Sequence, residues 1–102
     1  MNNLTKELIL ENISINSNKI KKFGVNKLTL FGSFARNEQT ENSDIDFLVD
    51  FDDTRGLFDD YMGLSLYLEK LFNKKVDLVK PHLVREELKS YIFDGVLHET
   101  RI

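Results

Sequence analysis

Apolar and acidic residues alternate along one segment near the middle of the chain. The apolar residues are Ile45, Phe47, Val49 and Phe51, and the acidic ones are Asp44, Asp46 and Asp50. A period of two is typical of a strand in a sheet that is covered on one face only. The pattern therefore predicts a strand over Ile45–Phe51, with one face in the core and one wet, acidic face that can hold a functional site.

The rest of the pattern predicts two more strands and four helical segments. We expect helices at about Leu4–Phe23, after Gly32-Ser33, at about Leu57–Phe72 and from Lys80-Pro81 onward, and strands at about Lys27–Phe31 and Lys75–Val79. The polar segment Asn12–Asn18 can interrupt the first helix, and Gly24 provides a stop for it. The order of the elements predicts one small domain over residues 1–102, of the α/β class and α+β type.

The segment Leu57–Phe72 carries an apolar stripe. Its members follow one another at steps of four and three: Leu57, Tyr61, Leu64, Leu68 and Leu71, with Phe58, Met62 and Phe72 widening the stripe. Residues at this spacing share one face of a helix. The segment is therefore predicted to form a long helix with one apolar face.

Two features of the sequence predict a nucleotide site. Gly32-Ser33 leaves a strand and opens a helix, where backbone N–H groups and a hydroxyl can hold the phosphates of a nucleotide. After ten intervening residues, Asp44 and Asp46 point to one face of the next strand, roughly 6.5 to 7 Å apart along the backbone. Carboxylates at that spacing can converge on Mg²⁺, which favours carboxylate, water and phosphate oxygens.

A third acid can join this pair from the strand over residues 75–79. If Val76 and Leu78 pack inward, Asp77 faces the side on which Asp44 and Asp46 lie. Two interpretations of Asp77 remain open. It completes the site, or it is a charge that protects an edge strand from pairing with another sheet.

Composition excludes several classes of protein. The chain of 102 residues has no cysteine, so it has no disulfide framework and no thiolate metal site. A net charge of −3, with seven aspartates between Asp44 and Asp60, argues against direct binding of nucleic acid. We expect the aspartates outside the site to form a solvated acidic rim. No apolar run approaches the roughly 18 residues of a membrane span, and we expect a cytoplasmic protein.

The residues from Gly32-Ser33-Phe34-Ala35-Arg36 through Ser43-Asp44-Ile45-Asp46-Phe47 resemble the polymerase-beta type of nucleotidyltransferases, and within it the minimal nucleotidyltransferases. The family pattern is Gly-Ser, ten residues, Asp-x-Asp and a later third acid, for which Asp77 is the candidate. The chain departs from it at Asn37, where the family usually has glycine. Because asparagine tolerates a left-handed backbone, we expect the turn to survive.

The resemblance implies a small nucleotidyltransferase fold, a short mixed sheet with helices on one face and the active site on the other. It implies catalysis and metal binding by Asp44, Asp46 and Asp77, with two Mg²⁺ ions and ATP as the substrate. It also implies nucleotide binding by Gly32, Ser33, Arg36 and Ser43. For Arg36, a phosphate contact and a salt bridge to a nearby aspartate are both open.

The resemblance further implies the acceptor and the partner. Related antitoxins transfer AMP to a tyrosine of a HEPN ribonuclease toxin, which implies a toxin partner and a hetero-oligomer here. Two alternatives remain. The chain can neutralise its partner by binding alone, which would require none of the site residues, or it can modify a small molecule, which the lack of room for a second domain disfavours.

Overall fold

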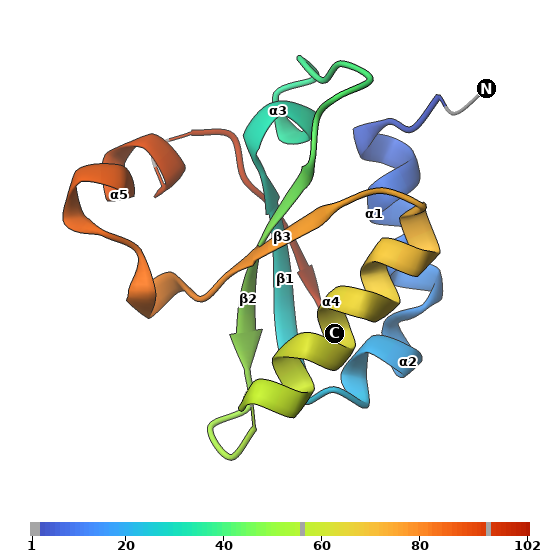
Figure 1. Cartoon of the computed structure of the whole chain (residues 1–102), viewed down its shortest axis with the longest axis vertical. Helices are drawn as coiled ribbons and strands as arrows, with labels where there is room; N and C mark the ends of the chain where they lie inside the picture. Colours follow the sequence, from blue (N-terminus) through green and yellow to red (C-terminus); the bar gives the residue numbers. More distant parts are fainter. Residues whose placement is uncertain (1–2, 56, 94) are drawn as a thin grey trace.

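A mixed sheet forms the centre of the computed structural model, which describes residues 3–55, 57–93 and 95–102 (Figure 1). Its strands are β1 (Val25–Phe31), β2 (Ile45–Phe51), β3 (Val76–Val79) and β4 (His98–Arg101), in the order β3-β2-β1-β4. β1 runs antiparallel to β2 and β4, whereas β2 and β3 are parallel. The strand predicted from the alternation is confirmed at both ends.

Three helices cover one face of this sheet. α1 (Lys6–Ile15), α2 (Ser17–Lys21) and α4 (Phe58–Phe72) lie together on one side in Figure 1. Their apolar side chains pack against those of the strands and form the main core. The helices contribute Ile9, Ile13, Ile20, Leu64 and Leu68, and the strands contribute Leu28, Leu30, Ile45, Phe47 and Val49. The odd positions of β2 are therefore in the core, as the alternation predicts.

The other face of the sheet is partly covered. η1 (Pro81–Leu83), a 3₁₀ turn, is followed by α5 (Glu86–Phe93), which lies on the opposite side of the sheet from α4. Ile92 and Val84 form a second apolar cluster with Phe31 and Leu48 of the strands. The fold class is as expected, but the helices are not confined to one face, because Leu48 interrupts the acidic side of β2 and requires cover.

Several boundaries differ from the sequence-based expectation. The first helical region breaks at Asn16, inside the predicted interval, and Gly24 adopts a left-handed φ of 81° after it. The helix predicted from Lys80-Pro81 begins only at Glu86, after the 3₁₀ turn. β4 was not predicted, because its sequence His-Glu-Thr-Arg has no apolar alternation.

The apolar stripe of α4 is buried only in part. Leu64, Leu68 and Phe72 are buried, but Leu57 is 78% exposed and Phe58 is 75% exposed. Phe58 lines an open pocket together with Val79, the last residue of β3, and Leu83. No helix among the described residues has the length and hydropathy needed to cross a membrane.

Candidate nucleotide and metal site

The pairing of β2 with β3 brings two of the predicted acids together. Asp46 and Asp77 are direct partners in the parallel ladder. Val76 and Leu78 are buried in the main core, so Asp77 points to the opposite face, which is the face of Asp46. The expectation that Asp77 shares a face with Asp46 is confirmed.

Gly32 lies directly against Asp46. It follows Phe31, the residue of β1 that pairs with Asp46, and has a φ of +77°, which disfavours residues with a Cβ. A Cβ at Gly32 would overlap the carboxylate of Asp46, with the carboxylate carbon 3.1 Å away. The glycine therefore permits both the sharp turn after β1 and the close approach of the backbone to the acid.

The carboxyl group of Asp46 is electrostatically unfavourable in its ionised form. Its pKa is raised from 3.8 to about 6, first because the group is partly buried and then because Asp77 and Asp44 repel its charge. Arg36 acts in the opposite direction and lowers this pKa. A site that gathers acids in this way favours a bound cation.

Asp44 stands just before β2, at the edge of the site. Its side chain is 39% exposed, and Lys75 Nζ lies 4.0 Å from its Oδ2. Lys75 precedes β3 and was not singled out from the sequence, where it is one lysine of a Lys-Lys pair. At this distance and exposure the ion pair contributes little to stability.

Ser33 lies in α3 (Gly32–Ala35), a single helical turn without a side-chain cap. The predicted helix is thus shorter than one that develops a strong dipole, so individual N–H groups must provide any anion contact. The turn closes through Asn37, which has a φ of 61°, and Glu38 N donates to Ser33 O at 2.9 Å. The left-handed conformation expected for Asn37 is confirmed.

Arg36 and Ser43 have partners within the loop that joins β1 to β2. Arg36 Nε donates to Glu38 Oε2 at 3.1 Å, and the positive charge of Arg36 also lowers the pKa of Asp46. Ser43 Oγ accepts from Thr40 N at 2.9 Å. The sequence did not predict a role for Glu38 or Thr40. Their contacts shape the loop that carries Arg36 and Ser43.

The carboxylates of the site can supply only some of the ligands of a magnesium ion. Within residues 3–55, 57–93 and 95–102, no three histidine, aspartate or glutamate side chains converge into a ready-made metal site. Magnesium commonly binds through one or two carboxylates together with water and substrate phosphates. Asp44 and Asp46 beside the Gly32 turn fit this kind of site, which a nucleotide would complete.

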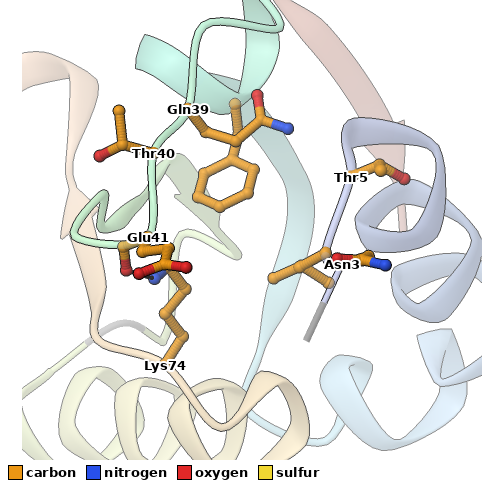
Figure 2. A pocket seen from close by; sticks show the side chains of 8 residues that line it. Asn3, Thr5, Gln39, Thr40, Glu41 and Lys74 are labelled. Carbon is orange, nitrogen blue, oxygen red and sulfur yellow. Dashed lines mark hydrogen bonds between the residues drawn. The ribbon is translucent and has the colours of Figure 1, made fainter. Parts of the chain in front are cut away.

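A pocket of about 600 Å³ lies away from these residues (Figure 2). It is bounded by the start of α1, by the loop through Gln39 and Glu41, and by Lys74. Lys74 Nζ donates to the backbone oxygen of Glu41 at 2.9 Å. None of the predicted site residues lines it, so size alone does not locate the site.

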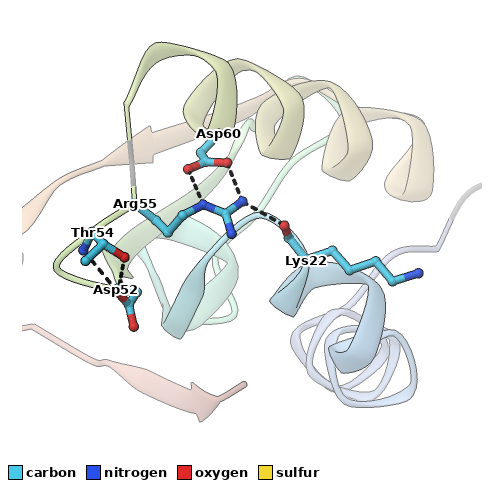
Figure 3. A network of polar contacts seen from close by, with 5 residues as sticks. All are labelled: Lys22, Asp52, Thr54, Arg55 and Asp60. Carbon is cyan, nitrogen blue, oxygen red and sulfur yellow. Dashed lines mark hydrogen bonds and ion pairs between the residues drawn. The ribbon is translucent and has the colours of Figure 1, made fainter.

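The expected acidic rim is only partly solvated. Arg55 donates to both carboxylate oxygens of Asp60, at 2.9 and 2.7 Å, and to the backbone oxygen of Lys22 (Figure 3). Asp50 lies 3.5 Å from Lys27 Nζ. Arg55 therefore connects the loop after β2 both to Asp60 of α4 and to the end of α2. The carboxylate of Asp52 accepts hydrogen bonds from the neighbouring Thr54.

Comparison with protein families gives a match over most of the chain. Residues 14–102 match the family described as nucleotidyltransferase domain. The protein adenylyltransferase MntA of Thermococcus cleftensis is 42% identical over 79 residues, which cover 78% of this chain and 75% of that protein. A Methanocaldococcus jannaschii protein with the provisional name protein adenylyltransferase is 51% identical over 59 residues, 57% of this chain but only 59% of its own length.

Solved structures agree in fold. A structure described as a minimal nucleotidyltransferase superposes with a TM-score of 0.75 at 28% identity, covering 93% of this chain and 96% of its own. A toxin–antitoxin crystal structure with AMP-PNP superposes with a TM-score of 0.61 at 23% identity, covering 96% of this chain and 72% of its own. The second likeness concerns the fold alone.

Proposed function

This chain belongs to the nucleotidyltransferase domain family, and from that premise we propose that it transfers AMP from ATP to a tyrosine of a partner protein. The partner in this proposal is a HEPN-type ribonuclease toxin, which the transfer silences. The observation that carries the proposal is the meeting of Gly32, Asp46 and Asp77 on one face of the sheet. We place the reaction in the cytoplasm, where ATP and RNA both occur.

The residues of the site take separate roles in this proposal. Gly32 and Ser33 hold the phosphates that leave as pyrophosphate, because the backbone N–H groups of the turn and the Ser33 hydroxyl can donate to phosphate oxygens. Arg36 and Ser43, on the loop above, contact the same nucleotide. Arg36 is suited to this role because a guanidinium carries several N–H donors in a planar fork that matches phosphate oxygens.

Asp44, Asp46 and Asp77 would hold Mg²⁺ together with phosphate oxygens. A cation held by these carboxylates would supply positive charge that stabilises the attacking and leaving oxygens and favours the ionised acceptor. It would also relieve the repulsion that raises the pKa of Asp46 to about 6. A bound cation would therefore offset the repulsion between the carboxylates, which destabilises the ionised cluster when no cation is present.

The reaction exchanges one phosphorus–oxygen bond for another. The tyrosine oxygen bonds to the α-phosphorus of ATP, and the bond from that phosphorus to the oxygen that bridges to the β-phosphate breaks. Pyrophosphate leaves with the electron pair. Asp77 either accepts the hydroxyl proton or completes the metal site. Because tyrosine has an ordinary pKa of about 10, removal of this proton matters at neutral pH.

The partner is supported by the relatives. One relative bears the name protein adenylyltransferase MntA, and one structure of the same fold is a toxin–antitoxin complex with an ATP analogue. The net charge of −3 also fits a partner that is basic around an RNA-cleaving site.

The test is to incubate the chain with ATP, Mg²⁺ and a HEPN-type ribonuclease from the same organism. We expect the toxin to gain the mass of one or more AMP groups on tyrosine and to lose ribonuclease activity. Asp44→Asn should transfer nothing. Asp50→Asn is the matched control, because Asp50 lies on the same strand but pairs with Lys27, and it should retain transfer.

An unmodified toxin that is inhibited equally by the wild-type and Asp44→Asn chains would contradict the enzymatic proposal. It would show that the chain acts by covering the ribonuclease.

A further inference from the structure

β3, which carries Asp77, is a short strand at the edge of the sheet. It has four residues and pairs only with β2 in the described part of the chain. Lys75 O accepts from Ile45 N at 3.0 Å, so backbone groups at alternate positions, including those of Asp77, face β2. The backbone groups of Val76 and Leu78, on either side of Asp77, face outward.

Two side chains of α4 bond to these outward groups. Tyr61 Oη donates to Leu78 O at 2.6 Å, and Glu69 Oε2 accepts from Val76 N at 3.1 Å. Tyr61 and Glu69 are eight residues apart, which places them on one face of the helix. The two bonds therefore grip the backbone immediately before and immediately after Asp77.

The bonded positions are well shielded from water. Val76 is 4% exposed and Leu78 is 7% exposed, and both contacts are partly buried. Hydrogen bonds in such surroundings hold more firmly than exposed ones. Lys80 Nζ lies 5.7 Å from the centre of the Tyr61 ring and thus helps to hold it.

We propose that Tyr61 and Glu69 are positioning residues, which clamp the edge strand β3 so that Asp77 stays beside Asp46. A clamp is needed because Asp77 and Asp46 repel each other as direct partners in the ladder. A short edge strand is also the element of a sheet that frays most readily. Displacement of a reacting group by a fraction of an ångström already slows an enzyme, so the clamp serves the proposed reaction.

This inference rests on the proposed function for its effect on turnover but not for the clamp itself. Tyr61→Phe removes one hydroxyl and keeps the ring. Tyr67→Phe is the matched control, because Tyr67 lies on the same helix and packs its ring on Phe23. Glu69→Gln keeps an oxygen that accepts from Val76, whereas Glu69→Leu does not.

Three measurements test the clamp: amide exchange at Asp77, the affinity for Mn²⁺ alone, and the kinetics of AMP transfer. For Tyr61→Phe and Glu69→Leu we expect exchange to rise and kcat to fall about five- to tenfold, as for the loss of one buried hydrogen bond. Binding of Mn²⁺ should weaken, whereas KM for ATP should not change. Glu69→Gln and Tyr67→Phe should behave like the wild type.

The outcomes separate the two proposals. If Tyr61→Phe matches Tyr67→Phe in amide exchange and in Mn²⁺ affinity, the clamp is wrong, whatever the activity. If the wild type transfers no AMP but exchange at Asp77 rises in Tyr61→Phe, the proposed function fails and the clamp stands. Equal losses in stability and in KM would assign Tyr61 a general structural role and overturn the positioning role.

Discussion

Asp46→Asn is expected to stabilise the metal-free fold while it abolishes nucleotide transfer. The carboxyl group of Asp46 is partly buried and faces Asp77 and Asp44, which together raise its pKa to about 6. Asparagine has nearly the same size and shape, so the substitution removes the charge without pressing on Gly32. The gain in stability therefore measures the electrostatic penalty of the site.

The magnitude follows from the difference in pKa between the folded and unfolded chain. A rise from 3.8 to about 6 corresponds to about 3 kcal/mol of destabilisation at neutral pH. Because the group is still partly in water, screening reduces this to about 1–2 kcal/mol. The penalty is fully present above about pH 6 and is relieved as the pH falls towards 4, where the folded state has taken up a proton that the unfolded state has not.

Urea unfolding with EDTA present, at pH 7.5 and again near pH 4.5, measures this penalty. At the higher pH the midpoint for Asp46→Asn should lie roughly 1 M urea above that of the wild type. At the lower pH the two midpoints should approach each other. Asp50→Asn is the control, because it breaks the exposed pair with Lys27, and it should shift stability by no more than about 0.5 kcal/mol.

The reasoning fails if Asp46→Asn is less stable than the wild type at pH 7.5, or if its advantage does not shrink at the lower pH. Either result would mean that the carboxylate is compensated within the fold. The site would then have no electrostatic demand for a cation.

Three further substitutions test other parts of the site. Gly32→Ala should lower the free energy of unfolding by about 2 kcal/mol or more, because φ is +77° and the new methyl group meets Asp46, and urea unfolding measures this. Ser33→Ala should weaken ATP binding by roughly 1.5–3 kcal/mol in titration calorimetry, as for a lost bond to a charged oxygen. Asp77→Asn should instead reduce kcat more than ATP affinity, and equal losses of affinity in both variants would contradict this division of roles.

Local sequence was sufficient for the features that depend on neighbours along the chain. The alternation of Ile45–Phe51 predicted the bounds and the core face of β2, because successive side chains of any strand point to opposite sides. The left-handed Asn37 was expected from the resemblance, because the family usually has glycine there and asparagine tolerates the same conformation. The face of Asp77 followed from the same parity rule, applied to Val76 and Leu78.

Which strands pair with one another, and in which register, became known only from the tertiary structure. Nothing local shows that Asp77 stands opposite Asp46, since that depends on which strands become neighbours and in which register. β4 escaped prediction because its four polar residues form a strand only against β1. The exposure of Leu57 and Phe58 likewise depends on which segments pack against the start of α4, and the periodicity of the helix does not reveal these segments.

Some chemical properties of the site depend on single side chains, and others depend on how distant segments pack together. The residue types and the spacing between Gly32 and Asp44 predict binding of phosphate and magnesium, because those preferences belong to the side chains themselves, and both stay predictions. The raised pKa of Asp46 and the contacts of Tyr61 and Glu69 with β3 arise only when distant segments pack together. Burial, repulsion and alignment are properties of the assembled sheet, because each requires partners that the chain brings from elsewhere.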